Sequence, residues 1–288
     1  MIMTVYSFKF IYPDDQPKRT VSDLLRTLNI PRKWRHFLRI GKKITINGHY
    51  RSFNQFVLPE DQVTLCFDHV ASQQHDYLAS GHQPQVVYED DNVLIIDKPA
   101  GQKTHPNENE TNTALNDCTT YLGYHPYITH RLDMLTRGLL LVAKNPVVVP
   151  LLNRQLVDKT LNREYIACVE KGRSEELKPF GTISEPISQD PTDPRKRCVT
   201  VAGYPAVTHY AVLSQNDRIA WLKITLETGR THQIRVHLAA KNNPILGDPL
   251  YNPNYKVGQR LALTAFRLTF KPPFQFDPKT ITLPDFDH

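Results

Sequence analysis

Residues 127–145 read Tyr-Ile-Thr-His-Arg-Leu-Asp-Met-Leu-Thr-Arg-Gly-Leu-Leu-Leu-Val-Ala-Lys-Asn, which places a polar cluster directly before an apolar run. The aliphatic run after Gly138 is short and ends at a proline, which predicts a buried strand. Asp133 comes just before that strand, where a charge is costly unless it has a partner. We expect the partner to be Arg230, which lies in a second unusual stretch at residues 227–238, Glu-Thr-Gly-Arg-Thr-His-Gln-Ile-Arg-Val-His-Leu.

These stretches belong to an ordered set of motifs. The spaced pattern His130-Arg131-Leu132-Asp133-x-x-Thr136-x-Gly138 resembles the catalytic signature of the RluA-type RNA pseudouridine synthases. Other stretches resemble the same family in the same order: Asp97-Lys98-Pro99-Ala100-Gly101 with His105-Pro106, Arg163-Glu164-Tyr165, Thr228 to Leu238, Gly247 to Tyr251, and Leu261-Ala262-Leu263. Ordered motifs over most of the chain are far more specific than one short motif.

The resemblance implies a catalytic set of Asp133, Tyr165 and Arg230. Asp133 is expected to act at the glycosidic bond, as a nucleophile or as a base, and the sequence leaves that choice open. Arg230 is expected to pair with Asp133 and keep its carboxylate charged. Tyr165 offers a flat ring to the uracil and a hydroxyl for proton transfer. Outside this motif set, a turn cap, an ordinary ion pair and a half-buried strand tyrosine would be the simpler interpretations.

Four further residues are expected to contact substrate. Arg131 would fill the gap left by the extruded uridine, because a stacked base hides the bond to be cut; a phosphate contact or a structural pair is the alternative. Leu263 would form a wall of the uracil pocket, although such a leucine is usually plain core. His130 is assigned to the same group. Arg137 stands where the family usually has serine, so we expect it to alter substrate contacts or local charge.

The N-terminal part of the chain carries most of the net charge. Residues 1–70 contain 11 Lys and Arg against 6 Asp and Glu, and residues 18–51 contain ten basic residues and one acid. The pattern predicts two short helices, the second basic, and then a hairpin around Asn47-Gly48. It resembles the small alpha-L RNA-binding domain, with a solvated basic face as the alternative. The expected RNA contacts are Arg32, Lys33, Arg35, Arg39, Lys42 and Lys43.

We expect a domain of this type at residues 1–69, a linker at 70–84 and a catalytic domain at 85–288. Predicted strands outnumber helices and few strand-helix-strand units alternate cleanly. This favours an α+β fold, with the catalytic domain on a largely antiparallel mixed sheet and flanking helices. We expect a helix at residues 151–161 and another capped by Thr231, a surface loop at residues 188–196, and a tail after Pro272 without core residues.

The sequence excludes several classes of protein. It has no apolar run long enough for a membrane span and no signal peptide, which indicates the cytoplasm. The four cysteines are dispersed and the histidines lack a metal-binding spacing, so we expect reduced thiols and no metal. The expected reaction is an isomerisation, which needs no redox cofactor or phosphate donor, and no such fingerprint is present. A monomer is expected.

The reaction implied by the resemblance converts uridine in RNA to pseudouridine, with ribosomal RNA as the first expectation and transfer RNA as the second. Two alternatives come from other classes of protein. A glycoside hydrolase would need a second carboxylate beside the bond, and the candidates Glu227 and Asp248 occupy positions that the family motif implies are structural. A non-catalytic RNA-binding protein would use only the basic N-terminal domain.

Overall fold

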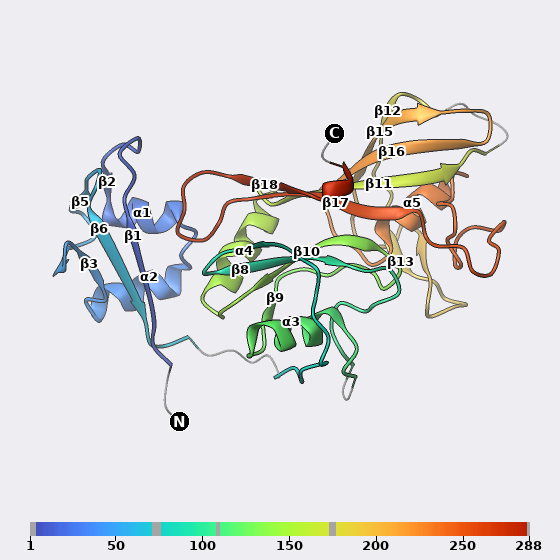
Figure 1. Cartoon of the computed structure of the whole chain (residues 1–288). Helices are drawn as coiled ribbons and strands as arrows, with labels where there is room; N and C mark the ends of the chain where they lie inside the picture. The colour runs from blue at the N-terminus through green and yellow to red at the C-terminus, as the bar shows by residue number, and fades with distance from the viewer. Residues whose placement is uncertain (1–3, 71–75, 108–109, 173–176, 287–288) are drawn as a thin grey trace.

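The computed structural model describes residues 4–70, 76–107, 110–172 and 177–286, and Figure 1 shows their arrangement. The predicted linker at 70–84 lies partly outside these residues. The helices are α1 (Val21–Thr27), α2 (Arg32–Ile40), α3 (Ala114–Leu122), α4 (Val148–Val157), α5 (Gln233–Ala240) and the 3-10 helix η1 (Pro284–Phe286). The strands are β1 (Tyr6–Ile11), β2 (Arg19–Thr20), β3 (Ile44–Ile46), β4 (His49–Tyr50), β5 (Phe56–Val57), β6 (Gln62–Phe67), β7 (Val86–Glu89), β8 (Val93–Lys98), β9 (Tyr127–Ile128), β10 (Arg137–Ala143), β11 (Asn162–Glu170), β12 (Phe180–Ile183), β13 (Ile187–Gln189), β14 (Arg197–Val199), β15 (Thr208–Gln215), β16 (Ile219–Leu226), β17 (Leu263–Phe270) and β18 (Lys279–Thr282).

The N-terminal elements form a small sheet with strand order β1-β6-β3-β4, and α1 and α2 lie beside it. The hydroxyl of Thr20 accepts a hydrogen bond from the backbone N–H of Asp23 at 3.1 Å, which caps α1 as the sequence predicts. Strands β3 and β4 pair around Asn47 and Gly48, both of which have positive φ, as a tight hairpin turn requires. The predicted pattern of two helices and a hairpin is confirmed.

The second sheet has the order β12-β15-β16-β11-β17-β10-β8-β7, with β18 and β9 paired at its sides. Of the strand pairs that the structure describes, β10 with β17 is parallel and the others are antiparallel. The predicted α+β class with a largely antiparallel mixed sheet is therefore confirmed. Gly138 makes the parallel pair possible, because a Cβ there would lie 2.2 Å from the carbonyl oxygen of Ala265.

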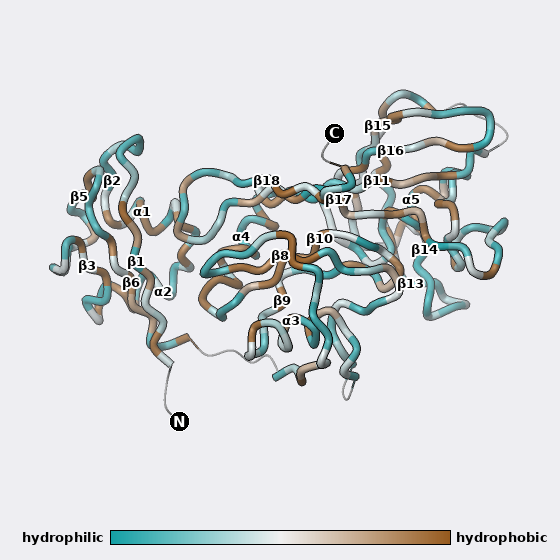
Figure 2. The backbone as a smooth tube through the Cα atoms, viewed as in Figure 1, coloured by the Kyte–Doolittle hydropathy of each residue, from teal (hydrophilic) through white to brown (hydrophobic). Residues whose placement is uncertain are grey.

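Strand β10 explains why its sequence is a continuous apolar run. Successive side chains of a strand point to opposite faces. Leu139 and Leu141 pack in the cluster that contains residues of α4, whereas Leu140 and Val142 pack in the cluster that contains residues of α3. Figure 2 shows hydrophobic residues concentrated along β8 and β10. Because the sheet is covered on both faces here, β10 is buried throughout and forms a rigid support for the residues that precede it.

Two predicted helices differ from the structure in their bounds. Helix α4 begins three residues before the predicted start and ends at Val157, since Lys159 adopts a left-handed backbone with φ of 58°. Helix α5 is not capped by Thr231. Its N-cap is His232, which has φ of 59° and makes no side-chain cap hydrogen bond.

The C-terminal prediction is wrong. Leu283 is fully buried, Phe274 is 7% exposed, and β18 pairs with β17, so the described part of the tail belongs to the core. The loop between β17 and β18 extends to the N-terminal sheet (Figure 1), where the ring of Phe274 stacks on Phe8 with 4.2 Å between centroids. The aromatic residues of this segment are spaced among prolines without a helical or strand periodicity, so nothing in the sequence indicated this packing.

The predicted surface loop at residues 188–196 is confirmed, since none of these residues is buried, and most of it forms the turn of a hairpin between β13 and β14. Ile187 of this hairpin packs with Ala206 and with Val236 of α5. The hairpin thereby covers the start of α5. None of the helices that the structure describes is long and apolar enough to cross a membrane.

Candidate active site

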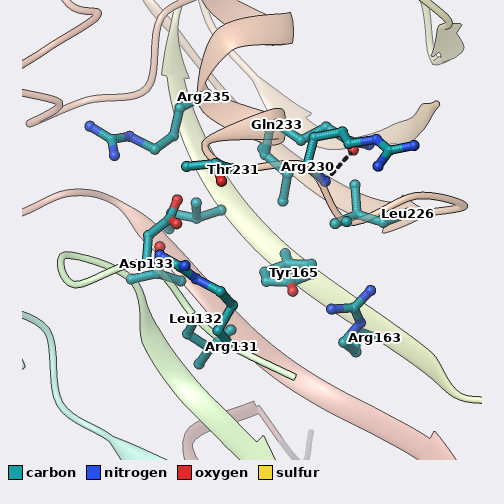
Figure 3. Close-up of a pocket in the computed structure, with 14 residues that line it drawn as sticks. Arg131, Leu132, Asp133, Arg163, Tyr165, Leu226, Arg230, Thr231, Gln233 and Arg235 are labelled. Atoms are coloured by element: carbon teal, nitrogen blue, oxygen red, sulfur yellow. Dashed lines mark hydrogen bonds between the residues drawn. The ribbon is translucent and has the colours of Figure 1, made fainter. Parts of the chain in front are cut away.

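A pocket opens where the loop before β10 faces β11, β17 and the start of α5 (Figure 3). It brings together the three residues expected to be catalytic and two of the four expected to contact substrate. The lining residues are Arg131, Leu132, Asp133, Thr136, Arg163, Tyr165, Leu226, Gly229, Arg230, Thr231, Gln233, Ile234, Arg235 and Leu263. These residues are separated by up to about half of the chain, so the fold and not local sequence assembles the pocket.

The loop that carries Asp133 is fixed by hydrogen bonds on both sides. Thr104 donates from its hydroxyl to the carbonyl of Leu132 at 2.7 Å and accepts from the N–H of the same residue at 3.1 Å. The N–H of Gly101 donates to the carbonyl of Met134 at 2.8 Å, and the N–H of Thr136 closes a turn on the carbonyl of Asp133 at 3.0 Å. A carboxylate on such a loop is preorganised, as a catalytic group has to be.

Lys98 supports the same loop from below. Its side chain is fully buried, and Nζ donates to the carbonyls of Pro99, Gln102 and Met134 at 2.9, 2.7 and 3.2 Å. Burial lowers the pKa of Lys98 to about 8, although the carboxylates of Asp133 and Asp97 oppose this shift. Lys98 therefore supports the Asp133 loop.

Tyr165 and Leu263 form the apolar side of the pocket. They come from the neighbouring strands β11 and β17, and they are 5% and 3% exposed. The register of this strand pair shifts between Glu164 and Tyr165, and such a bulge redirects a side chain next to a site. Burial raises the pKa of Tyr165, with the carboxylate of Asp133 adding to the effect, so its hydroxyl keeps its proton at neutral pH. A flat ring, a leucine and a carboxylate therefore face one space.

The polar side of the pocket is rich in arginine. Arg131, Arg163, Arg230 and Arg235 all line it, and Asp133 is the one carboxylate among its lining residues. No ion pair involving Arg131 or Arg163 is formed within the described residues. The guanidinium of Arg163 lies beside Gly229, where an added Cβ would be 3.4 Å from its NH2 atom. A pocket with this charge distribution suits a polyanion such as RNA.

The predicted ion pair between Asp133 and Arg230 is wrong for this structure. Nε of Arg230 donates to the carbonyl of Pro205 at 3.0 Å, and the guanidinium lies over the ring of Tyr204, 5.5 Å from its centroid. Figure 3 shows the Arg230 side chain pointing away from Asp133. The sequence places an arginine at the pocket, but the direction of its side chain depends on the residues at 204 and 205, which come from another part of the chain.

A different arginine is paired beside the pocket. Arg235 binds Asp248 through two hydrogen bonds of 2.7 Å, with the two side chains 2% and 0% exposed. Burial lowers the pKa of Arg235, but the hydrogen bonds that Arg235 donates to Asp248, together with the charges of Asp248 and Asp133, outweigh this effect and raise the pKa. Because Arg235 is paired with Asp248, its charge is already neutralised, and Asp133 has no ion-pair partner among the described residues.

Arg137 does not line this pocket, and its expected role in substrate binding remains a prediction. Its guanidinium binds the buried carboxylate of Asp97 at 2.8 Å and that of Asp285 at 3.0 Å. Side chains alternate along β10, and Arg137 projects towards β8 and the C-terminal segment. The replacement of the usual serine therefore joins three segments of the scaffold.

His130 does not line the pocket and makes a structural contact, and its expected contact with substrate remains a prediction. The side chain is 8% exposed, and Nε2 accepts a hydrogen bond from the backbone N–H of Leu141 at 3.1 Å. Burial, with the charge of Arg163, lowers the pKa of His130 to about 3. A neutral ring at this position fastens the Asp133 loop to β10.

The basic residues predicted to bind RNA lie on α2 and the turn after it. Arg32, Lys33, Arg39 and Lys42 are exposed, whereas Arg35 and Lys43 are half-buried. Lys43 pairs with Asp68. No ion pair of the other five is formed within the part of the chain that the structure describes. Exposed, unpaired cations on one short element fit the interpretation as an RNA surface.

Sequence reasoning missed Arg163, Gln233 and His232. Arg163 is two residues before Tyr165 on a strand, which predicts the same face, so a signal was available. Gln233 holds the Arg230 loop by accepting from the N–H of Arg230 at 3.0 Å and donating to the carbonyl of Val207 at 2.9 Å. Nothing in the sequence distinguishes this glutamine from an ordinary helix residue.

No group of three or more His, Cys, Asp and Glu side chains suited to a metal ion occurs among the described residues. The four cysteines, Cys66, Cys118, Cys168 and Cys198, are free thiols, and two of them are buried.

Comparisons with known proteins agree with this arrangement. Residues 92–240 match the family described as RNA pseudouridylate synthase, and residues 8–63 match the RluD ribosomal pseudouridine synthase N-terminal domain. The uncharacterized RNA pseudouridine synthase YhcT of Bacillus subtilis (strain 168) is 38% identical over 236 residues, which cover 78% of this chain and 75% of YhcT. The ribosomal large subunit pseudouridine synthase D of Escherichia coli (strain K12) is 41% identical over 175 residues, which cover 58% of this chain and 52% of that protein.

Among solved structures, human RNA Pseudouridylate Synthase Domain Containing 1 has the same fold, with a TM-score of 0.59 and 24% identity over 71% of this chain and 84% of the human one. The family match covers 149 of 288 residues and includes the Asp133 loop, β11 and α5. The chain therefore belongs to the RNA pseudouridine synthases, isomerases that act on uridine in RNA, and its N-terminal domain is of the RluD type.

Proposed function

We propose that this enzyme isomerises specific uridines of ribosomal RNA, with Asp133 acting at the glycosidic bond of an extruded uridine. The observation that carries the proposal is the isolated carboxylate of Asp133 in a pocket otherwise lined by arginines, Tyr165 and Leu263. Ribosomal RNA is favoured over transfer RNA by the match at residues 8–63 and by the relatives named as large-subunit synthases.

The proposed reaction breaks the bond between the ribose and the uracil nitrogen and forms a bond from the ribose to carbon 5. Carbon 5 loses its proton to water, and the freed nitrogen takes up a proton, so the product is an isomer of uridine. Asp133 serves either as nucleophile or as base in this sequence. The ring of Tyr165 supports the uracil and Leu263 limits its movement, since both are fixed by neighbouring strands. Arg131 takes the place that the uridine leaves in the RNA stack.

Arg230 is proposed to complete the catalytic set. It already lines the pocket, and one hydrogen bond and one ring contact hold its side chain at Pro205 and Tyr204. Both contacts are at the protein surface, where they are weak. RNA phosphates near the pocket would draw the guanidinium from this position towards Asp133 and the substrate.

The remaining assignments concern the rest of the molecule. We assign residues 1–69 to the RNA-binding domain, 70–84 to the linker and 85–288 to the catalytic domain. The cations at positions 32, 33, 35, 39, 42 and 43 would bind RNA phosphates. Because one chain supplies the whole pocket, we propose a monomer, and we place it in the cytoplasm with its RNA.

The test uses ribosomal and transfer RNA transcripts that carry tritium at carbon 5 of uracil. The wild-type enzyme should release tritium to water from ribosomal RNA, and Asp133→Asn should release none while retaining RNA affinity. Release from transfer RNA alone would overturn the choice of substrate. Equal release by Asp133→Asn would overturn the role of Asp133.

A further inference from the structure

A second pocket adjoins the candidate active site on the other side of Asp133. It shares Arg131, Leu132 and Asp133 with the first pocket, but neither Tyr165 nor Leu263 lines it. Its remaining lining residues are Lys103, Thr104, His105, Asn107, Met134 and His232. A carboxylate that acts on a glycosidic bond has the base on one side and the sugar on the other. With the uracil on the Tyr165 side, the second pocket receives the sugar and its phosphate.

The chemistry of this second pocket fits an anionic, oxygen-rich group. Lys103, Arg131, His105 and His232 offer cations or N–H groups, and Asp133 is the one carboxylate that lines it. Lys103 is paired with Glu110 outside the lining. His105 also lines this pocket, and its Nδ1 is buried without a hydrogen-bond partner among the described residues.

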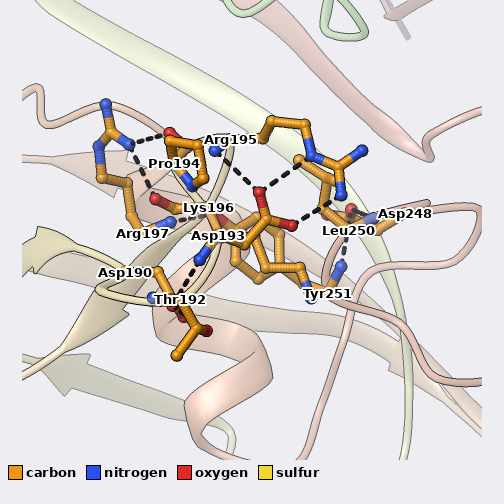
Figure 4. A network of polar contacts seen from close by, with 10 residues as sticks. All are labelled: Asp190, Thr192, Asp193, Pro194, Arg195, Lys196, Arg197, Asp248, Leu250 and Tyr251. Carbon is orange, nitrogen blue, oxygen red and sulfur yellow. Dashed lines mark hydrogen bonds and ion pairs between the residues drawn. The ribbon is translucent and has the colours of Figure 1, made fainter.

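The tautomer of His232 follows from its neighbours. The backbone N–H of Arg197, on the β13–β14 hairpin, donates to the hydroxyl oxygen of Tyr251 at 2.8 Å (Figure 4). The hydroxyl proton of Tyr251 then has one acceptor among the described residues, Nδ1 of His232 at 2.9 Å. Burial lowers the pKa of His232, against the opposing charge of Asp133, so the ring is neutral at pH 7. A neutral ring that accepts at Nδ1 carries its proton on Nε2.

The backbone of His232 is strained in the same region. Its φ of 59° and ψ of 16° lie in the left-handed region, which is uncommon for residues other than glycine. Such conformations persist where the surrounding structure enforces them, and they concentrate at active sites. In this case the strain turns the residue at the start of α5 so that its ring reaches both Tyr251 and the second pocket.

We propose that His232 is a further substrate-contacting residue, which donates its Nε2–H to the sugar-phosphate of the target nucleotide. Tyr251 is the positioning residue that fixes the tautomer. His105 lines the same pocket as His232. Among the described residues Nε2 of His232 has no hydrogen-bond partner, so the donor is available to RNA. This inference rests on the function proposed above.

The experiment measures single-turnover tritium release by the wild type and by His232→Gly, whose glycine suits the left-handed backbone. We expect the rate at saturating enzyme to fall roughly ten- to hundredfold, as expected for the loss of one charged hydrogen bond. The enzyme concentration for half-maximal rate should change less than about threefold. Added imidazole, at a pH where it is neutral, should restore part of the rate. 1-Methylimidazole can accept from Tyr251 but has no N–H, so it should not.

Each outcome decides between the two proposals. If the wild type releases no tritium from any transcript, the proposed function fails. If the wild type is active and His232→Gly matches it, or if both imidazoles restore the rate equally, the assignment of His232 fails alone. Should His232→Gly unfold, His232→Asn serves instead, because asparagine also tolerates this backbone and cannot reach the position of Nε2. Tyr251→Phe should lower the rate by a smaller factor than His232→Gly or His232→Asn.

Discussion

The carboxylates of Asp133 and Asp248 have opposite surroundings in the fold. Asp248 is fully buried and makes two hydrogen bonds of 2.7 Å to Arg235. Asp133 lines an open pocket with four arginines, and none of them forms an ion pair with it in the structure described. The carboxylate of the scaffold is satisfied within the protein, whereas the carboxylate of the site is left for the substrate. This difference distinguishes the structural acid Asp248 from Asp133, the acid that we propose to be catalytic.

The largest expected effect on stability comes from breaking the buried ion pair between Asp248 and Arg235. Asp248→Asn leaves the charge of Arg235 buried without compensation, and we expect the free energy of unfolding to fall by about 3–5 kcal/mol. Urea denaturation measures this change. Asp133→Asn is the matched control and should leave stability within about 0.5 kcal/mol of the wild type. Similar losses for the two variants would contradict the comparison.

The pH dependence of stability tests the support of the Asp133 loop. The pKa of His130 is lowered to about 3 in the folded protein from the ordinary histidine value of 6.5. Between these values the unfolded chain binds the additional proton, so the folded state loses stability as the pH falls below about 6.5. His130→Gln keeps an acceptor for the N–H of Leu141 and cannot titrate in this range. The free energy of unfolding of this variant should fall less steeply than that of the wild type as the pH decreases. The two slopes should differ by up to about 1.4 kcal/mol per pH unit. Parallel curves for the two proteins would refute this role of His130.

Arg137 provides a smaller test of a scaffold ion pair. Arg137→Ser restores the residue that the family usually has and leaves the buried carboxylate of Asp97 without its cation. We expect a loss of about 1–2 kcal/mol in the free energy of unfolding, because the guanidinium is partly exposed. Turnover measured below the unfolding transition should stay within about twofold of wild type. A tenfold loss of turnover without loss of stability would return Arg137 to the substrate site.

The smallest effect is expected at the basic surface of α2. Reversing the charges of Arg32, Lys33 and Arg39 removes up to three phosphate contacts, so RNA affinity should fall roughly tenfold and its salt dependence should become shallower. Filter binding over a range of salt concentrations measures both. Reversal of Arg218, an exposed residue on the turn between β15 and β16, is the control. An unchanged affinity in the triple variant would remove α2 from the RNA surface.

The sequence predicted those parts of the molecule that depend on local chemistry or on an ordered set of motifs. The cap of α1 by Thr20, the hairpin at Asn47-Gly48 and the buried strand after Gly138 follow from short-range patterns, and the structure contains all three. The meeting of Asp133 with Tyr165 and Leu263 was implied by family resemblance alone. No periodicity in the sequence brings those three residues together.

The contacts that differ from the expected ones share one physical cause: the direction of a side chain depends on segments that are distant in the sequence. Arg230 turns to the carbonyl of Pro205, and Arg137 turns to Asp97 and Asp285. The tail after Pro272 becomes core because Phe274 finds Phe8 at the other end of the chain. Each partner is more than twenty residues away in sequence, so a motif can identify the residue without revealing its contact.

The most direct test of the unpaired carboxylate compares Asp133→Asn and Asp248→Asn in one single-turnover tritium assay. It uses carbon 5-labelled ribosomal RNA and a temperature at which both variants are folded by circular dichroism. The structure predicts a loss of at least about a thousandfold for Asp133→Asn at unchanged RNA affinity, and measurable turnover for Asp248→Asn. Turnover by Asp133→Asn within tenfold of wild type would contradict the central claim that this carboxylate performs the chemistry.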